Sequence, residues 1–140
     1  MGFEKFGKIN YTSETKVKDF VNHLEKGKIE ATQCRVCKKV YFPPRMDCSN
    51  CLATDQMNWK EIDNEWTLLT YTKAHFAPTG FEEDTPYILA IAESNEGLKT
   101  LARLSKEVSE AKVKLGMKLR LVPVKLPHDK TVYEFKLSST

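Results

Sequence analysis

The sequence has no long apolar segment, and its longest apolar run, Tyr87–Ala92, is far too short to cross a bilayer. The first ten residues, MGFEKFGKIN, carry charges where a secretory signal needs an apolar core. The sequence therefore predicts a cytoplasmic protein without a membrane span. There are only six glycines, and no P-loop, G-x-G-x-x-G or G-x-S-x-G motif is present. The common phosphate-binding loops and the nucleophile elbow of hydrolases are thereby excluded.

A recognisable catalytic constellation is also lacking. The three histidines, His23, His75 and His128, form no H-x-x-x-H pair, and no cysteine lies outside one short segment. The acidic run Glu82–Asp84 lies between a glycine and a proline, where a solvated loop tip is the simpler interpretation. The sequence thus predicts a protein that is not an enzyme.

A strong charge of one sign is absent as well. The net charge is +3, which is milder than the basic excess of most nucleic-acid-binding domains. Residues 1–60 hold 11 basic and 7 acidic side chains, whereas residues 61–140 hold 11 and 12. The N-terminal part suits an anionic partner, but an ordinary solvated surface has the same composition. Both interpretations stay open at this point.

All four cysteines are gathered in one segment, as two Cys-x-x-Cys pairs separated by ten residues: Cys34, Cys37, Cys48 and Cys51. Two such turns facing each other complete a tetrahedral zinc shell, which is closed and therefore structural. The alternatives are two disulfides in an oxidising compartment, a redox pair, or iron held by the same thiolates. Zinc fits the spacing best. Lys38, Lys39 and Arg45 lie between the pairs and can offset the formal −2 charge of the centre.

An amphipathic helix is expected before the cysteines, over about residues 13–26. Thr12 or Ser13 can cap its start, Glu14 suits the positive end of the helix dipole, and Gly27 can end it. The apolar stripe repeats at helical spacing and comprises Val17, Phe20, Val21 and Leu24.

The pattern changes to β after Cys51. Five strands are expected, at residues 66–76, 86–93, 98–104, 117–126 and 132–137, with turns at 94–97 and 127–130. A polar, helix-compatible insert at 106–114 separates the third strand from the fourth, which is the element order of an OB-fold barrel. Other small five-stranded barrels remain possible.

The predicted fold class is therefore mostly β, with an N-terminal helical segment (1–30), a rubredoxin-like zinc ribbon (31–60) and a five-stranded OB-fold barrel (61–140). The ribbon is too small to form a large hydrophobic core, so we expect it to pack on the helix and on the barrel.

Nearly the whole chain resembles a known family, the zinc-ribbon/OB-fold acyl-CoA-associated proteins, long catalogued as a domain of unknown function. The specific part is the run from Cys34-x-x-Cys37 through Tyr41-Phe42-Pro43-Pro44-Arg45 to Cys48-x-x-Cys51. Supporting features are Gly27-Lys28, Trp59, Tyr71-Thr72, Pro86-Tyr87, Glu96-Gly97 and Gly116-Met117.

Two positions depart from the family pattern. Lys38 stands where the family has a glycine after the second cysteine, and a lysine adopts a positive φ less readily. The stretch Asp63–Trp66 stands where the family has a Gly-x-Gly-like step before the first barrel strand.

The resemblance implies a non-catalytic scaffold for an acyl-CoA enzyme, such as a thiolase, hydroxymethylglutaryl-CoA synthase or an acyl-CoA hydratase. It also implies contact with coenzyme A or acyl-CoA, whose phosphates would be recognised by lysines and arginines. The candidates are Arg45, Lys38, Lys39, Lys73 and Arg103. The alternative function is a nucleic-acid-binding zinc-ribbon/OB module, which the slightly acidic C-terminal part disfavours. A stand-alone zinc hydrolase conflicts with the closed four-thiolate shell.

Overall fold

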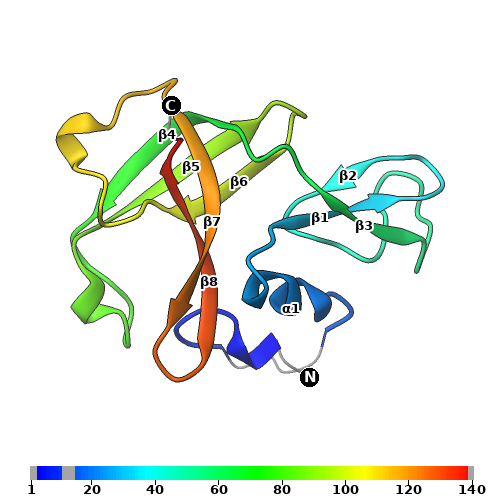
Figure 1. Ribbon diagram of the computed structural model, residues 1–140, viewed down its shortest axis with the longest axis horizontal. Coiled ribbons are helices and arrows are strands. Elements are labelled where there is room, and N and C mark those ends of the chain that lie inside the picture. Colours follow the sequence, from blue (N-terminus) through cyan, green and yellow to red (C-terminus); the bar gives the residue numbers. More distant parts are fainter. Residues whose placement is uncertain (1–2, 11–14, 139–140) are drawn as a thin grey trace. The chain divides into compact units, whose positions relative to one another are not determined.

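The computed structural model describes residues 3–10 and 15–138 (Figure 1). Two units are distinguished by their internal contacts. The N-terminal unit comprises Met1–Ile62 together with Pro123–Val132, and the C-terminal unit comprises Asp63–Val122 together with Tyr133–Thr140. The chain is mostly β, as predicted, and its described part contains one α-helix. No helix in this part of the chain has the length and hydropathy needed to span a membrane.

The helix α1 (Asp19–Glu25) is shorter than the helix predicted over residues 13–26. The N–H groups of Phe20 and Val21 donate to the carbonyls three residues before them, so a tight turn precedes the helix. Thr12, Ser13 and Glu14 lie outside the described residues. The predicted end is confirmed: Gly27 has φ +82°, and the N–H of Lys28 donates to the His23 carbonyl at 2.8 Å. This left-handed glycine and its hydrogen bonds close the helix.

Three of the four residues of the predicted apolar stripe, Phe20, Val21 and Leu24, are buried in the N-terminal unit, whereas Val17 precedes α1 and is half-buried. The ring of Phe20 contacts the rings of Phe6 and Phe42, each with a centroid distance of 5.9 Å. The ring of His23 meets Trp59 edge-on at 4.8 Å. The helix therefore packs on the ribbon as expected, whereas packing of the ribbon on the barrel stays a prediction.

The ribbon is built on an antiparallel sheet in the order β2-β1-β3. Thr32 is fully buried at its centre, opposite Tyr41 on one side and Trp59 on the other. The N-terminal segment adds an isolated bridge from Phe6 to Thr131 and a short 3₁₀ turn, Phe3–Lys5. The three strands are β1 (Glu30–Cys34), β2 (Val40–Tyr41) and β3 (Met57–Glu61).

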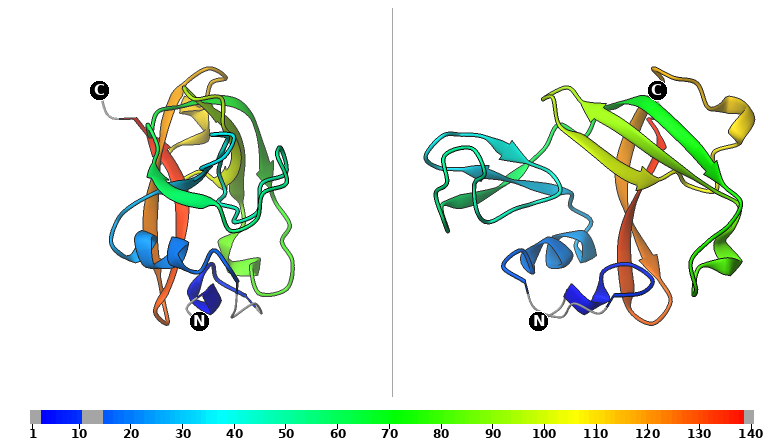
Figure 2. Two further views of the ribbon diagram at one scale, coloured as in Figure 1. Left: turned by 90° about the vertical axis from the view of Figure 1, so that its right-hand side faces the viewer. Right: turned by 180° about the vertical axis from the view of Figure 1, so that it is seen from behind.

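The five strands expected for the OB-fold part form one sheet in the order β6-β5-β4-β7-β8. Strands β4, β5 and β6 form one twisted layer, seen from two further sides in Figure 2. The turn between β5 and β6 lies where predicted, with Gly97 at φ +86°. The strands are β4 (Trp66–Ala74), β5 (Tyr87–Ser94), β6 (Lys99–Arg103), β7 (Lys118–Leu126) and β8 (Lys130–Leu137).

The prediction of a closed barrel is wrong, because the five strands form an open sheet. Among the described residues, the chain just after β6 meets β8 at one isolated bridge, between Leu104 and Phe135. The Ser105 N–H also donates to the Phe135 carbonyl at 2.8 Å. The far end of the β7–β8 hairpin, Pro123–Val132, groups with the N-terminal unit.

The insert at 106–114 is also less helical than its polar sequence suggested. Its regular structure is one 3₁₀ turn at Glu110–Lys112, and a second lies at Glu82–Asp84 in the β4–β5 loop. Val108 and Val113 anchor the insert by their burial. The centre of the C-terminal unit consists of side chains that are almost fully buried: Trp66, Leu68, Leu119, Leu121 and Phe135.

Candidate metal centre

The first cysteine pair forms a knuckle at the end of β1. The Cys34 carbonyl accepts the Lys38 N–H at 2.9 Å, and the Cys34 N–H donates to the Lys39 carbonyl at 2.9 Å. Lys38 completes the turn with φ +68°. The departure from glycine noted in the sequence therefore falls on a left-handed residue, where glycine would carry less strain.

The second pair repeats this arrangement. The Cys48 N–H donates to the Ala53 carbonyl at 3.0 Å, five residues further on, as Cys34 does to Lys39. Leu52 follows Cys51 with φ +65°, matching Lys38 after Cys37. The Cys51 N–H points at the Cys48 sulfur, 3.5 Å away. Two similar knuckles thus present their sulfur atoms to each other.

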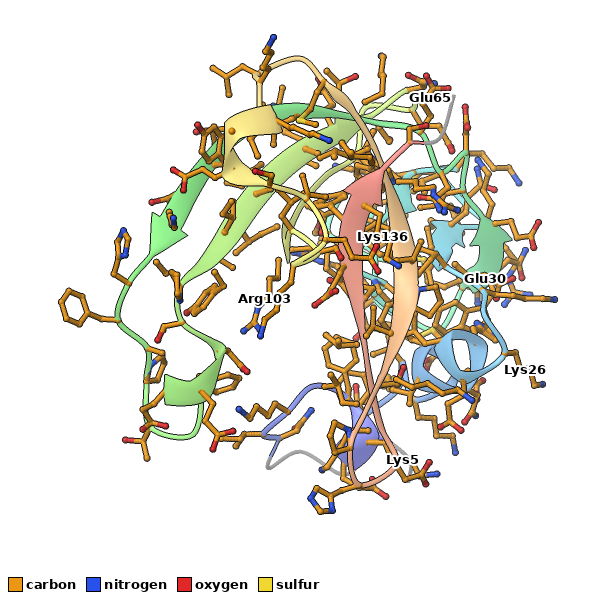
Figure 3. All side chains as sticks on the ribbon, turned by 60° about the vertical axis from the view of Figure 1, so that its left-hand side comes forward. Lys5, Lys26, Glu30, Glu65, Arg103 and Lys136 are labelled. Atoms are coloured by element: carbon orange, nitrogen blue, oxygen red, sulfur yellow. The ribbon has the colours of Figure 1, made fainter. Side chains whose placement is uncertain are left out.

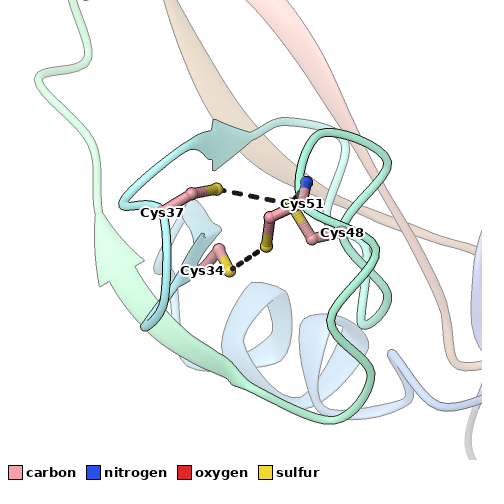
Figure 4. Close-up of side chains that lie close together, drawn as sticks. All are labelled: Cys34, Cys37, Cys48 and Cys51. Atoms are coloured by element: carbon pink, nitrogen blue, oxygen red, sulfur yellow. Dashed lines mark hydrogen bonds between the residues drawn. The ribbon is translucent and has the colours of Figure 1, made fainter.

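The four sulfur atoms lie within 4.8 Å of one another (Figure 4). Cys34 Sγ is 3.6 Å from Cys51 Sγ, and Cys37 Sγ is 3.5 Å from Cys48 Sγ. Tetrahedral zinc with Zn–S bonds of about 2.3 Å separates its sulfur ligands by about 3.8 Å. Disulfides need about 2.05 Å, and all four cysteines are free. The donor set and its spacing fit zinc, and a shell of four thiolates leaves no open coordination position.

The surroundings favour ionised sulfur at the buried Cys48. Hydrogen bonds from the Tyr41 hydroxyl and from backbone N–H groups lower the pKa of Cys48 to about 6. A hydrogen bond from the Asn50 side chain is the main cause that lowers the pKa of Cys37. The Ala53 N–H also favours the Cys51 thiolate, but burial and the neighbouring thiols raise the pKa of Cys51 to about 11. Each ionised thiolate makes ionisation of its neighbour less favourable. A metal cation overcomes this effect because it stabilises several adjacent thiolates together.

The basic residues proposed for coenzyme A lie in two different environments. Lys39 and Arg45 place their cationic groups over the ring of Tyr41, each 5.5 Å from its centroid. Lys38 is exposed, and its carbonyl accepts a hydrogen bond from Gln33 at 3.0 Å. These three residues belong to the ribbon, beside the cysteine cluster.

The other two candidates belong to the C-terminal unit and are engaged in ion pairs. Lys73 Nζ lies 2.5 Å from a Glu110 carboxylate oxygen. Arg103, labelled near the end of β6 in Figure 3, lies 3.4 Å from an Asp84 carboxylate oxygen and stacks on Tyr87 at 4.4 Å. The structure therefore brings the ribbon candidates near each other and gives Lys73 and Arg103 carboxylate partners.

One residue of the site was missed by the sequence reasoning. Tyr41 is 8% exposed, and its hydroxyl lies 3.3 Å from Cys48 Sγ. In the sequence it stands inside an apolar run before Pro43-Pro44, so a core aromatic was the natural interpretation. Its position seven residues before Cys48 carries no signal that the two side chains meet.

Family models match both parts of the chain. Residues 22–56 match the rubredoxin-like zinc ribbon domain of ChsH2, and residues 59–124 match the C-terminal OB-fold domain of ChsH2. The class of protein is therefore a zinc ribbon followed by an OB-fold domain, with the four cysteines as the site for a structural zinc ion.

Similar proteins from other organisms are named DUF35 domain-containing scaffold proteins. The protein from Methanocaldococcus jannaschii is 31% identical over 100 residues, covering 69% of this chain and 68% of the relative. The protein from Pyrococcus furiosus is 31% identical over 85 residues, covering 61% of each chain. The chain therefore belongs to the family of DUF35 domain-containing scaffold proteins.

Solved structures show the same fold. The structure named Ltp2-ChsH2(DUF35) aldolase has a TM-score of 0.75 and 21% identity, with 93% of this chain and 99% of that chain covered. A DUF35 protein of unknown function from Sulfolobus solfataricus has a TM-score of 0.58 and 22% identity, with 86% and 84% covered. At these identities the likeness concerns the fold alone.

Proposed function

We propose that this chain is a non-catalytic scaffold that binds an acyl-CoA enzyme, such as a thiolase, hydroxymethylglutaryl-CoA synthase or an acyl-CoA hydratase. The observation that carries the proposal is the closed four-cysteine cluster in a chain whose relatives are named scaffold proteins. The structure named Ltp2-ChsH2(DUF35) aldolase, whose name pairs a second component with a DUF35 chain, supports an enzyme as the partner.

The chemistry of the site supports a non-catalytic role. Thiolytic and Claisen-type steps need an activated nucleophile with a matched base. The four thiolates that would serve as nucleophiles are ligands of the metal, and a closed shell offers no position for water or substrate. Binding is therefore the task that these residues can perform.

Exposed apolar side chains on the C-terminal unit provide contact area for a protein partner. Ile91 on β5 and Leu101 on β6 are directly opposite in the ladder, and they are 37% and 55% exposed. Phe76, at the start of the β4–β5 loop, is 91% exposed. Large apolar side chains of this kind supply much of the affinity when a partner buries them.

A finer part of the proposal is that the ribbon contacts coenzyme A. A shallow hollow of about 440 Å³ in the N-terminal unit combines apolar Val17, Pro44 and Met46 with cationic Lys16 and Arg45. Its remaining lining residues are Thr15 and Asp47. Apolar walls with a guanidinium suit a pantetheine arm and a phosphate, respectively. Lys16 is held by Asp47 and Asp55, so Arg45 is the better phosphate ligand.

The experiment is co-expression with a thiolase-type enzyme of the same organism, followed by size-exclusion chromatography and assays of each component. We expect a complex that survives chromatography, and no turnover of acyl-CoA substrates by the purified chain alone. Failure to form a complex with any of the three enzyme classes would remove the scaffold proposal. Turnover by the isolated chain would show that it is an enzyme.

A further inference from the structure

The hydroxyl group of Tyr41 lies against the second cysteine knuckle. Tyr41 Oη is 3.3 Å from Cys48 Sγ, and it is 3.1 Å from both the backbone nitrogen and the side-chain oxygen of Ser49. The whole residue is 8% exposed, and Cys48 is 3% exposed. The contact is therefore shielded from water, where a hydrogen bond to a charged group is strongest.

The direction of the hydrogen bonds follows from the donors available. A phenol has one proton to donate and two lone pairs to accept with. The Ser49 N–H uses one lone pair of Tyr41, and the Ser49 hydroxyl can donate to the other. A metal-bound thiolate can only accept a hydrogen bond, so the Tyr41 hydroxyl donates its proton to Cys48 Sγ. The Cys51 N–H is a second donor to the same sulfur, at 3.5 Å.

The ring of Tyr41 has a second role near the metal. The Lys39 ammonium and the Arg45 guanidinium each lie 5.5 Å from its centroid, within the range of a cation–π contact. Zinc with four thiolates carries a formal charge of −2, which nearby cations stabilise. Tyr41 thus holds two positive charges close to the centre while its hydroxyl contacts a ligand.

We propose that Tyr41 is an outer-shell residue of the zinc centre, whose hydroxyl donates a hydrogen bond to the Cys48 thiolate and fixes the orientation of that ligand. This inference does not depend on the scaffold function. Hydrogen bonds to ligating sulfur withdraw electron density from it, so the ligand becomes less nucleophilic and the metal is retained more firmly. Tyr41 acts through Cys48 and is a positioning residue.

The test uses Tyr41→Phe, which keeps the ring and the two cation contacts and removes only the hydroxyl. Tyr71→Phe is the matched control, because it removes the same hydroxyl group from an exposed residue of β4. In the full-length protein loaded with cobalt, we expect the thiolate-to-metal charge-transfer band of Tyr41→Phe to move to lower energy. In the zinc form, we expect zinc transfer to a chromogenic chelator to be about 10-fold faster.

A measurement on the unmodified protein covers the case in which Tyr41→Phe fails to fold. After substitution with an NMR-active cadmium isotope, the Tyr41 hydroxyl proton should exchange slowly with water and show a coupling to the metal through Cys48. The proposal is overturned if that proton shows no coupling. It is equally overturned if Tyr41→Phe folds and matches Tyr71→Phe in both the charge-transfer energy and the rate of zinc transfer.

Discussion

The side-chain amide of Asn64 pairs with the backbone of Leu121 as a neighbouring strand would. Asn64 Nδ2 donates to the Leu121 carbonyl at 2.7 Å, and the Leu121 N–H donates to Asn64 Oδ1 at 2.9 Å. The same Oδ1 accepts the indole N–H of Trp66 at 2.9 Å, and Trp66 is fully buried. One side chain therefore links the start of β4 to the middle of β7, at the position where the chain departs from the family's glycine-rich step.

Asn64→Ala is expected to destabilise the C-terminal unit by about 3 kcal/mol, because three polar groups around it lose their partner. The midpoint of denaturant unfolding, followed by Trp fluorescence, measures the change. Asn95→Ala is the control, since Asn95 makes one exposed hydrogen bond to Asp63 and should cost less than about 0.5 kcal/mol. Equal effects of the two substitutions would contradict a structural role for Asn64.

Lys38→Gly is expected to stabilise the zinc-loaded protein by about 1 kcal/mol, because it removes the strain of a side chain at φ +68°. Val36→Gly is the control: the φ of Val36 is not positive and its side chain is 63% exposed, so glycine should destabilise the protein by about 0.5–1 kcal/mol. Thermal melting in the presence of zinc separates the two. A loss of stability in both variants would mean that the positive φ of Lys38 carries no strain.

Cys48→Ser is expected to abolish binding of one zinc ion per chain and to unfold the ribbon, because structural zinc supplies on the order of 10 kcal/mol to small metal domains. Metal analysis and melting of natively purified protein measure both effects. We also expect the C-terminal unit to melt at a lower temperature. If its melting is unchanged, the two units are thermodynamically independent and the predicted packing of the ribbon on the barrel is wrong.

Arg45→Glu is expected to lower the affinity of the enzyme complex for coenzyme A by about 10-fold, since attraction to a phosphate becomes repulsion. The zinc content should stay at one ion per chain, because Arg45 is not a ligand and its charge over Tyr41 affects only how tightly the ion is held. Lys112→Glu, an exposed charge reversal on the C-terminal unit, is the control. Equal affinity of the Arg45→Glu and unmodified complexes, measured by calorimetry, would remove Arg45 from the site.

Binding to nucleic acid is expected to be nonspecific, weaker than about 1 μM at physiological salt, and steeply dependent on salt concentration. The mild net charge of +3 is the reason. Fluorescence anisotropy with single-stranded and double-stranded oligonucleotides at several salt concentrations measures it. Tight, sequence-selective binding would instead favour the alternative function, with the exposed Phe76 as a candidate for base stacking.

The features that the sequence predicted well are those set by short-range patterns. The cysteine spacing predicted the cluster of four cysteines, and the β-type sequence pattern located all five strands of the larger sheet within a few residues. Gly27 ends α1 and Gly97 lies in the turn after β5, both with the positive φ that glycine adopts without strain. These signals are local because each depends on neighbours within a few residues along the chain.

Features set by long-range contacts were missed. The open sheet depends on how β6 meets β8, two strands whose sequences carry no information about their closing register. The sequence also carries no sign that Phe42 packs against Phe20 and is only 6% exposed, or that Trp59 contacts His23. The hydroxyl contacts of Tyr41 likewise depend on a partner from another part of the ribbon. Only the folded chain brings such pairs together.

The hairpin tip that joins the N-terminal unit bears on how the protein can be divided into fragments. Phe6 bridges to Thr131, the Gly7 N–H donates to the Thr131 carbonyl at 2.6 Å, and Lys130 Nζ donates to the Glu4 carbonyl at 2.7 Å. A single cut after Ile62 therefore yields a ribbon fragment that lacks Lys130 and Thr131. The OB fragment in turn lacks the N-terminal residues that these two contact. Each unit is built from two separate segments of the chain, so a fragment that keeps all of a unit's residues must include both of its segments.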